Sequence, residues 1–245
     1  MKKEEIAITV KDLHVYYRDM KRFSLKRSGV KGRGSGKIFK ALKGVSFEVP
    51  KGQILGICGK NGSGKSTLLR AISGIFSPDS GSINLHGNTI SLLSIGVGFQ
   101  KKLTGYENIY LSGMLLGYSK EQIDEKVDEI IEFSELGDFV YKPVSSYSSG
   151  MYSKLAFSIT AILETDIMLI DEVLSVGDIH FKEKSYNKMK ELISDSDRTV
   201  VIVSHSTKTI VELCDKVIWL HDGLIKDEGK PEEIMEKYES FMRQD

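Results

Sequence analysis

The stretch from Gly59 to Ser66 limits the possible folds of this chain more than any other, because its residues follow the spacing G-x-x-x-x-G-K-S. That spacing is typical of a phosphate-binding loop when a strand precedes it and a helix follows it. Here the apolar run 54–58 predicts a buried strand, and the apolar-rich segment 67–72 predicts a helix. The motif has its required context, so we expect an α/β fold built around it rather than a glycine-rich turn.

This loop carries a specific chemical expectation. Its glycines let consecutive amides point into one hollow at the positive end of the following helix, where a phosphate binds favourably. Lys65 is expected to reach the β- and γ-phosphates of a nucleotide, and Ser66 to ligate Mg²⁺. The candidate nucleotide-binding residues of this phosphate loop (59–67) are Gly59, Lys60, Asn61, Gly62, Ser63, Gly64, Lys65, Ser66 and Thr67.

Two acidic residues, Asp171 and Glu172, end a second candidate core strand, the apolar run 167–170. The carboxyl ends of buried parallel strands lie where ligands bind in open α/β sheets. We expect Asp171 to hold Mg²⁺, through water, opposite Ser66. Glu172 is the candidate general base that polarises a water attacking the γ-phosphate. Two solvated acids at a strand end are the alternative, and the phosphate loop makes it the weaker one.

Two polar residues are further catalytic candidates. His205 follows the apolar strand 200–203 and would face the γ-phosphate if that strand neighbours the one that ends in Asp171. Gln100 stands at the junction with a helix-rich segment, within reach of both the metal and the attacking water. A hydrogen-bonded core histidine and a surface amide are the alternative interpretations.

Residues 100–165 are rich in helical patterns and form a candidate insertion in the α/β core. Ser119 and Gln122 make a capping box at the start of a helix expected to run to Leu136. The small polar run 146–151 opens another helix, which is expected to extend through Ile162. The amides at its start serve as a simple N-cap or bind a phosphate, and the residues alone leave both open.

The N-terminal third adds two open questions. Tyr16 and Tyr17 lie just before a loop, where either ring packs in the core or stacks on a nucleobase. The segment 18–40 carries nine basic residues against the single acid Asp19. Either it is a solvated loop, or it contacts anionic lipid headgroups or a phosphate-rich substrate.

Composition narrows the class of protein. A net charge of zero opposes a general nucleic-acid binder, and no apolar run approaches the ~20 residues of a spanning helix. Cys58 and Cys214 fit no metal spacing and are expected to be buried, reduced thiols. The N-terminus has no signal-peptide core. We therefore expect a soluble cytosolic protein, for which any membrane role requires a partner that supplies the spanning helices.

Together these motifs resemble those of the ATP-binding-cassette ATPases, the nucleotide-binding subunits of membrane transporters. The matching positions span nearly the whole chain, namely Tyr17, the phosphate loop, Gln100, a signature segment (147–151), Asp171 and Glu172, the loop 175–178, and His205. The resemblance implies an α/β P-loop NTPase fold with a mainly parallel core sheet, an antiparallel β subdomain and an inserted helical subdomain. It implies one domain, 1–245, with the core in 1–99 and 166–245, the helices in 100–165 and a basic insertion at 18–40.

The resemblance also implies how the site works. Two copies form a head-to-tail homodimer, and each ATP with its Mg²⁺ lies between the phosphate loop of one copy and the signature segment of the other. Ser148, Ser149 and Gly150 then act in trans, Asp178 belongs to the adjoining D-loop, and Tyr17 rather than Tyr16 stacks on adenine. Glu172, His205 and Gln100 are the catalytic candidates, whereas Ser66, Gln100 and Asp171 are the metal-binding ones. ATP hydrolysis drives a pair of transmembrane permease subunits that dock around residues 100–117.

The signature segment departs from the usual family pattern, since Tyr147, Ser149 and Met151 stand where Leu, Gly and Gln are usual. With the segments 103–109, 175–178 and 213–220 and the basic insertion, it resembles the exporters of cell-surface polysaccharides, O-antigens and wall teichoic acids. We therefore expect an ATPase subunit at the cytoplasmic face of the bacterial membrane, exporting a lipid-linked polymer. Wall teichoic acid is favoured, and O-antigen or capsular polysaccharide is the alternative. No added C-terminal carbohydrate-binding domain is expected.

Rival classes fit the residues less well. A DNA-repair ATPase needs a long coiled coil, and a translation ATPase usually has two cassettes in one chain. A nucleotide-binding module without turnover is opposed by Lys65, Asp171, Glu172 and His205. An importer or drug-exporter ATPase remains the less favoured transporter.

Overall fold

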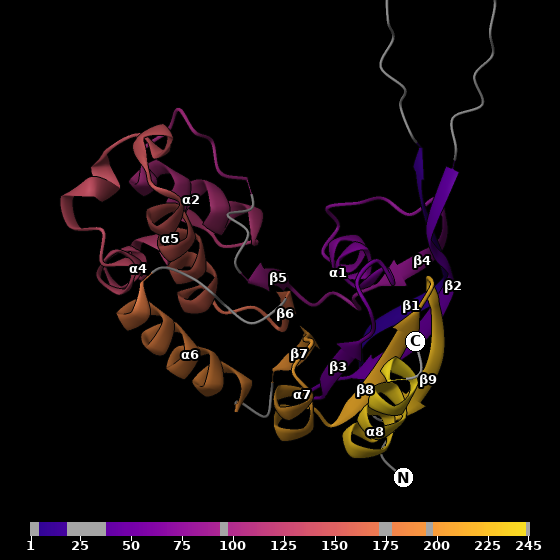
Figure 1. The fold of residues 1–245 in the computed structure, drawn as a ribbon. Helices are drawn as coiled ribbons and strands as arrows, with labels where there is room; N and C mark the ends of the chain where they lie inside the picture. The colour runs from indigo at the N-terminus through magenta and orange to yellow at the C-terminus, as the bar shows by residue number, and fades with distance from the viewer. Residues whose placement is uncertain (1–4, 19–37, 94–97, 172–177, 195–197, 244–245) are drawn as a thin grey trace, which may run out of the picture.

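The computed structural model describes residues 5–18, 38–93, 98–171, 178–194 and 198–243. Figure 1 shows two sheets side by side and a group of helices beyond the edge of the larger one. The elements in chain order are β1 (Ile6–Arg18), β2 (Ile38–Pro50), β3 (Ile54–Cys58), α1 (Lys65–Ile72), β4 (Ser80–Asn84), β5 (Ile90–Leu93), α2 (Gly105–Leu115), α3 (Lys120–Asp124), α4 (Val127–Ser134), the 3-10 turns η1 (Gly137–Tyr141) and η2 (Val144–Ser146), α5 (Ser149–Ile162), β6 (Ile167–Asp171), α6 (Ile179–Ile193), β7 (Thr199–Val203), α7 (Thr207–Leu213), β8 (Lys216–His221), β9 (Leu224–Gly229) and α8 (Pro231–Met242).

The larger sheet has the strand order β5-β6-β7-β3-β8-β9. All neighbouring pairs are parallel except β8 and β9, which form an antiparallel hairpin. Strand β7 is buried along its whole length, as expected for a parallel strand that is covered on both faces. The predicted mainly parallel core sheet is thereby confirmed.

The smaller sheet, in the order β2-β1-β4, is antiparallel, as predicted. Its inner residues share one apolar core with α1 and the large sheet, including Ile8, Leu42 and Val45 with Leu55 and Leu68. This packing places the end of the β1–β2 pair next to the phosphate loop. Within the described residues, no helix has both the length and the apolar character needed to cross a bilayer.

Helices α2 to α5 surround an apolar core of their own, which includes Ile109, Ile130, Leu155 and Ile159. The predicted capping box of Ser119 and Gln122 is present at the start of α3. The expectation of one helix from there to Leu136 was wrong, because the chain forms α3 and α4, with Lys126 at φ −114° before the second helix. The apolar spacing did not reveal this break, since Ile123 and Ile130 face the same core on either side of it.

The two cysteines behave as the sequence predicts. Cys58 and Cys214 are both free and buried. Burial raises the pKa of each thiol to about 12, so both stay protonated and unreactive at neutral pH.

Three segments that carried expectations lie outside the described residues. They are Glu172, residues 175–177 of the D-loop, and residues 19–37 of the basic insertion.

Candidate functional site

The phosphate loop turns sharply between β3 and α1, and glycine is required at both ends of the turn. A Cβ atom on Gly59 would lie 2.1 Å from the carbonyl oxygen of Leu220. Gly64, which caps α1, has φ +106°, and a Cβ atom there would lie 2.7 Å from the carbonyl oxygen of Ala41. Only glycine fits at these two positions, as the sequence predicts for a loop whose backbone folds tightly around a phosphate.

Lys65 begins α1 and folds back over the phosphate loop. Its Nζ donates to the carbonyl oxygens of Gly59 at 2.7 Å and Lys60 at 3.0 Å. The side chain is 6% exposed, so a buried ammonium group lies at the mouth of the loop. A buried cation of this kind is a strong site for phosphate oxygens.

Ser66 and Asp171 face each other across the site. Ser66 Oγ donates to Asp171 Oδ1 at 3.3 Å, joining the first turn of α1 to the end of β6. Hydroxyl and carboxylate oxygens suit Mg²⁺, which prefers one or two protein ligands together with phosphate and water. No three His, Cys, Asp or Glu side chains converge in a metal-binding group among the described residues. A Mg²⁺ ion at Ser66 and Asp171 would therefore depend on the nucleotide for further ligands.

His205 lies beside this pair because β6 and β7 are neighbours, with Asp171 opposite Val203. The sequence predicted that His205 would face the γ-phosphate only if these two strands are neighbours, and they are. The side chains and backbone around the phosphate loop form one hollow. The residues that line this phosphate-loop hollow are Phe39, Ala41, Asn61, Gly62, Gly64, Lys65, Ser66, Thr67, Asp171, Val203 and His205.

The two tyrosines at the end of β1 have different surroundings. Tyr17 is 40% exposed, and its hydroxyl lies 3.1 Å from Thr67 Oγ1 in α1. Tyr16 is bonded instead to His14 Nδ1 at 3.0 Å. Tyr17 is therefore the ring next to the phosphate loop, where it presents an exposed aromatic face.

Phe39 is a site residue that the sequence analysis missed. It pairs with Tyr17 across β1 and β2, is 59% exposed and lines the phosphate-loop hollow. Cross-strand partners project on the same side of a sheet, so Phe39, which lines the hollow, lies next to Tyr17, which does not line it but contacts Thr67 at its edge. A lone aromatic residue between Ile38 and Lys40, at the end of a basic segment, was the available signal.

Gln100 is not among the residues that line the phosphate-loop hollow. Its backbone is held by the buried Asn108, whose Oδ1 accepts from Gln100 N–H at 2.7 Å. Asn108 Nδ2 in turn donates to the carbonyl oxygens of Gln100 and Thr104. Asn108 thus fixes the loop that carries Gln100, a role that the sequence analysis did not identify.

The signature segment lies at the start of α5, as predicted. Ser148 is the N-cap, and its Oγ accepts from Met151 N–H at 3.2 Å. Neither Ser148 nor Ser149 nor Gly150 lines the phosphate-loop hollow of the same chain. Figure 1 shows α5 within the helical group, on the far side of β5 and β6 from α1.

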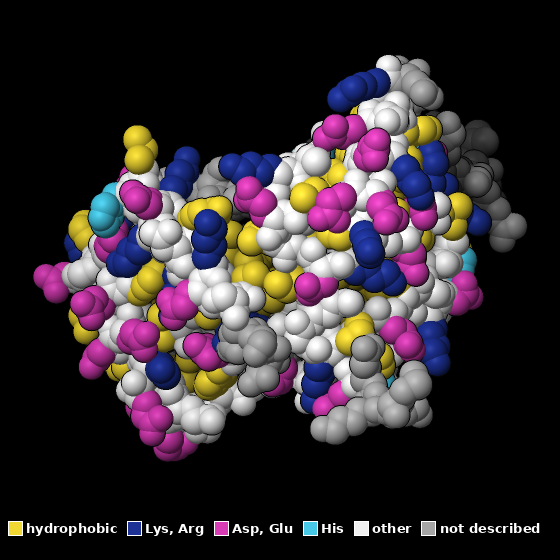
Figure 2. All heavy atoms as spheres, turned by 90° about the horizontal axis from the view of Figure 1, so that it is seen from below, with side chains coloured by type: hydrophobic (Ala, Val, Ile, Leu, Met, Phe, Trp, Pro, Cys, Tyr) yellow, Lys and Arg dark blue, Asp and Glu magenta, His cyan; other side chains and the backbone are white. Residues whose placement is uncertain are grey.

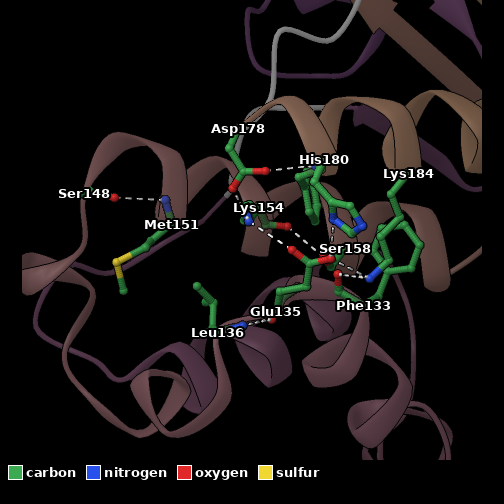
Figure 3. Close-up of polar contacts among 12 residues, drawn as sticks. Phe133, Glu135, Leu136, Ser148, Met151, Lys154, Ser158, Asp178, His180 and Lys184 are labelled. Carbon is green, nitrogen blue, oxygen red and sulfur yellow. Dashed lines mark hydrogen bonds and ion pairs between the residues drawn. The ribbon is translucent and has the colours of Figure 1, made fainter.

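Asp178 caps the start of α6 and makes an ion pair that the sequence analysis missed. Its Oδ1 accepts from Phe181 N–H at 3.0 Å, and its Oδ2 lies 2.8 Å from Lys154 Nζ. Lys154 and the helix cap lower the pKa of the Asp178 carboxyl to about 2. Figure 3 shows Lys154 reaching from α5 to this carboxylate.

An apolar groove opens between the helical group and the large sheet. Its lining includes Ile75, Leu92, Phe99, Leu115 and Ile159. Leu115 and the adjacent Met114 are more than half exposed. Part of its lining, Ser112, Leu115 and Leu116, belongs to the region around residues 100–117 where the sequence predicts a partner.

Comparisons with known proteins agree with this geometry. A family profile described as "ABC transporter" matches residues 42–175. The O-antigen export system ATP-binding protein RfbB of Klebsiella pneumoniae is 41% identical over 84% of this chain and 84% of its own length. The teichoic acids export ATP-binding protein TagH of Lactococcus lactis is 46% identical over 84% of this chain but only 44% of its own length.

Solved structures share the fold. A dimeric ATP-binding cassette in a post-hydrolysis state with ADP and phosphate matches with a TM-score of 0.69 at 22% identity, over 91% of this chain and 98% of that one. The chain spans about half the length of several curated relatives, including 45% of the RfbB protein of Myxococcus xanthus. The profile match over more than half of the sequence, together with these relatives, establishes that the chain belongs to the ABC transporter family.

Proposed function

We propose that this chain is the ATP-hydrolysing subunit of a membrane exporter that moves a lipid-linked cell-surface polymer. The observation that carries the proposal is the phosphate-loop hollow, where Lys65, Ser66, Asp171 and His205 converge in a chain related to O-antigen and teichoic acid export proteins. Wall teichoic acid is the favoured cargo. O-antigen is the second candidate, because the Klebsiella relative matches over most of both chains.

We assign each candidate residue a task in ATP hydrolysis. Lys65 binds the β- and γ-phosphates, and Tyr17 stacks on the adenine ring. Mg²⁺, held by Ser66 and Asp171, would neutralise phosphate charge. His205 donates a hydrogen bond at the γ-phosphate, and Glu172 serves as the general base for the attacking water.

A second copy of the chain completes each site. Ser148, Ser149 and Gly150 offer a hydroxyl-rich helix start that suits phosphate, yet they do not line the phosphate-loop hollow of their own chain. A head-to-tail homodimer brings each helix start to the hollow of the partner copy and forms two equivalent sites. ATP then favours the closed dimer, and hydrolysis favours its opening.

The apolar groove is the proposed docking site for a transmembrane permease subunit. Leu115 and Ile75 offer exposed apolar surface at its rim, next to the loop that Asn108 holds. A short helix with apolar side chains at the membrane face of the permease fits such a groove. Docking there would hold the chain at the cytoplasmic face of the membrane and transmit dimer closure to the permease.

Nucleic acid is not a proposed partner. The chain has a formal net charge of zero, and basic and acidic side chains are interspersed over the face shown in Figure 2. A nucleic-acid-binding surface instead concentrates Lys and Arg on one face.

The deciding experiment reconstitutes the chain with its transmembrane permease subunits in lipid vesicles. We expect lipid-linked teichoic acid to stimulate ATP hydrolysis and to be transported, with lipid-linked O-antigen as the parallel substrate. Glu172→Gln should bind ATP but release almost no phosphate. Stimulation by O-antigen alone would reassign the cargo, and stimulation by neither polymer would contradict polymer export.

A further inference from the structure

A charged network joins three elements of the helical region near the start of α6 (Figure 3). Glu135 and Lys184 come from the end of α4 and from α6, Lys154 comes from α5, and Asp178 caps α6. Lys154 Nζ lies 3.0 Å from Glu135 Oε2 and 2.8 Å from Asp178 Oδ2. Lys184 Nζ lies 3.1 Å from the other oxygen of Glu135. Lys154 is thus the side chain of this group that bridges two acids on separate elements.

Lys154 is held firmly in this position. Its side chain is 13% exposed, and its Nζ lies 4.9 Å from the centre of the Phe181 ring. Burial opposes its charge, but the hydrogen bonds to Asp178 and Glu135 outweigh that cost and raise its pKa. An ammonium group in such surroundings stays charged and has few alternative rotamers, so the bridge has a defined geometry.

Glu135 is aimed at Lys154 by the end of its own helix. It caps α4 in the left-handed conformation, with φ +58°, which is uncommon for a residue other than glycine. The chain turns there, and the carboxylate projects toward α5 and α6 (Figure 3). This unusual backbone position is the second sign that the network is a built feature rather than a chance surface pair.

The bridge joins Lys154, in the second turn of α5, to Asp178 at the start of α6. Ser148 begins α5 about 9 Å along the helix axis from Lys154, at 1.5 Å per residue. Asp178 begins α6. In the dimer proposed above, the start of α5 faces the partner copy. We infer that the start of α6, capped by Asp178 of the adjoining D-loop, faces it too, so their relative position decides whether both reach it together.

We propose that Lys154 is a positioning residue that holds the starts of α5 and α6 in register, so that a second copy of this chain meets them as one surface. This inference rests on the proposed homodimer and names the side chain that prepares its surface. Without the bridge, the phosphate-loop hollow still binds ATP, but the closed dimer forms only at higher nucleotide concentration.

The test uses the full chain with the Glu172→Gln change, so that ATP is bound without turnover. ATP-driven dimer formation is followed by light scattering, and ATP binding to dilute monomer is followed with a fluorescent analogue. We expect Lys154→Met to raise the ATP concentration for half-maximal dimer formation about tenfold, the range of a direct pairwise coupling. Monomer affinity should stay within about twofold, because Lys154 lies outside the hollow. Lys154→Arg keeps the positive charge, so it should retain most of the ATP-driven dimer formation.

Lys184→Met is the matched control. Lys184 pairs with the same Glu135 rather than with Asp178, so its loss weakens the network without separating α5 from α6. We expect near-parental dimer formation for this variant. Asp178→Asn keeps an oxygen for the helix cap but removes the charge, so it should match Lys154→Met. The double variant Lys154→Met with Asp178→Asn should need no more ATP for dimer formation than either single variant.

The outcomes separate the two proposals. If the Glu172→Gln chain itself never dimerises with ATP, the homodimer is wrong and the positioning role falls with it. If that chain dimerises but Lys154→Met behaves identically, only the positioning role is wrong. Equal losses in Lys154→Met and Lys184→Met would also overturn it, because they would indicate a general loss of stability.

Discussion

Ser66 Oγ donates a 3.3 Å hydrogen bond to Asp171 Oδ1, which joins the phosphate loop to the end of a strand that lies 105 residues further along the chain. The bond places one hydroxyl and one carboxylate where a Mg²⁺ ion could use both. It is the contact that turns two separate sequence motifs into one site.

Removing that hydroxyl tests the proposed metal site. We expect Ser66→Ala to raise the Mg²⁺ concentration needed for half-maximal ATP hydrolysis about 10–100-fold, the usual cost of disturbing a metal's immediate surroundings. Titration of ATPase activity with Mg²⁺ measures this shift. Ser73→Ala is the control, since that hydroxyl donates to the carbonyl oxygen of Arg70 at the other end of α1. An unchanged Mg²⁺ requirement in Ser66→Ala would exclude the hydroxyl as a ligand.

The two tyrosines at the end of β1 give a second test. Tyr17→Ala should weaken ATP binding by about 1–3 kcal/mol, the range for loss of a stacked base. Tyr17→Phe should retain most of the affinity, because the ring remains. Tyr16→Ala should bind ATP normally, since Tyr16 contacts His14 rather than α1. Calorimetry with ATP distinguishes the variants, and equal losses at both tyrosines would contradict the assignment.

Gly64 gives a prediction about stability. Gly64→Ala suffers both the strain of φ +106° and a Cβ contact of 2.7 Å with the backbone of Ala41. Gly74→Ala has φ +75° with no atom within 4 Å of the new Cβ, so it should cost only about 1–2 kcal/mol of backbone strain. Urea unfolding should therefore show a clearly larger loss for Gly64→Ala. A similar loss for both would mean that Ala41 shifts without resistance.

The ion pair of Asp178 predicts a pH dependence. Its pKa is lowered from the ordinary value of 3.8 to about 2, so its contribution to stability is complete well above pH 3.8, starts to fall as the pH approaches 3.8 and is lost as the pH falls through about 2. The difference in urea midpoint between wild type and Asp178→Asn should be constant from pH 7 to pH 5. It should then narrow steadily at pH 4 and pH 3. A difference that stays constant down to pH 3 would show that the carboxylate gains nothing from Lys154.

The apolar groove is the proposed docking site of the permease, and a charged substitution at its rim tests that assignment. Leu115→Asp introduces a charge at its rim and should abolish co-purification with the permease, while ATP binding to the isolated chain stays normal. Leu224→Asp is the control, because Leu224 is similarly exposed but belongs to β9, away from the helical group (Figure 1). Intact co-purification of Leu115→Asp would move the docking site elsewhere.

The sequence predicted the local parts of this structure well. The phosphate loop, the helix start at Ser148 and the capping box at Ser119 each depend on a few consecutive residues, and each lies where its pattern indicates. The class of fold followed from the same local signals. The meeting of Asp171 with Ser66 was expected from the two motifs, whereas the position of His205 was expected only if its strand neighbours the one that ends in Asp171.

Contacts between distant residues could not be derived in this way. The break between α3 and α4 leaves the apolar face continuous, so periodicity does not record it. Phe39 reaches the hollow only because β2 pairs with β1 in one particular register. Lys154 and Asp178 stand 24 residues apart on different helices, and nothing in their local sequence marks them as partners.

The separate apolar interior of α2 to α5 has a mechanical consequence. The core around Ile109 and Leu155 lies within the helical group, whereas Phe157 and Ala161 of α5 share a second core with Met168 and Ile170 of β6, so a swing of the helices against the sheet would repack that second core and leave the first intact. Such a swing would carry α5 along intact, so the energy of each turnover can go into motion between bodies rather than into unfolding within them.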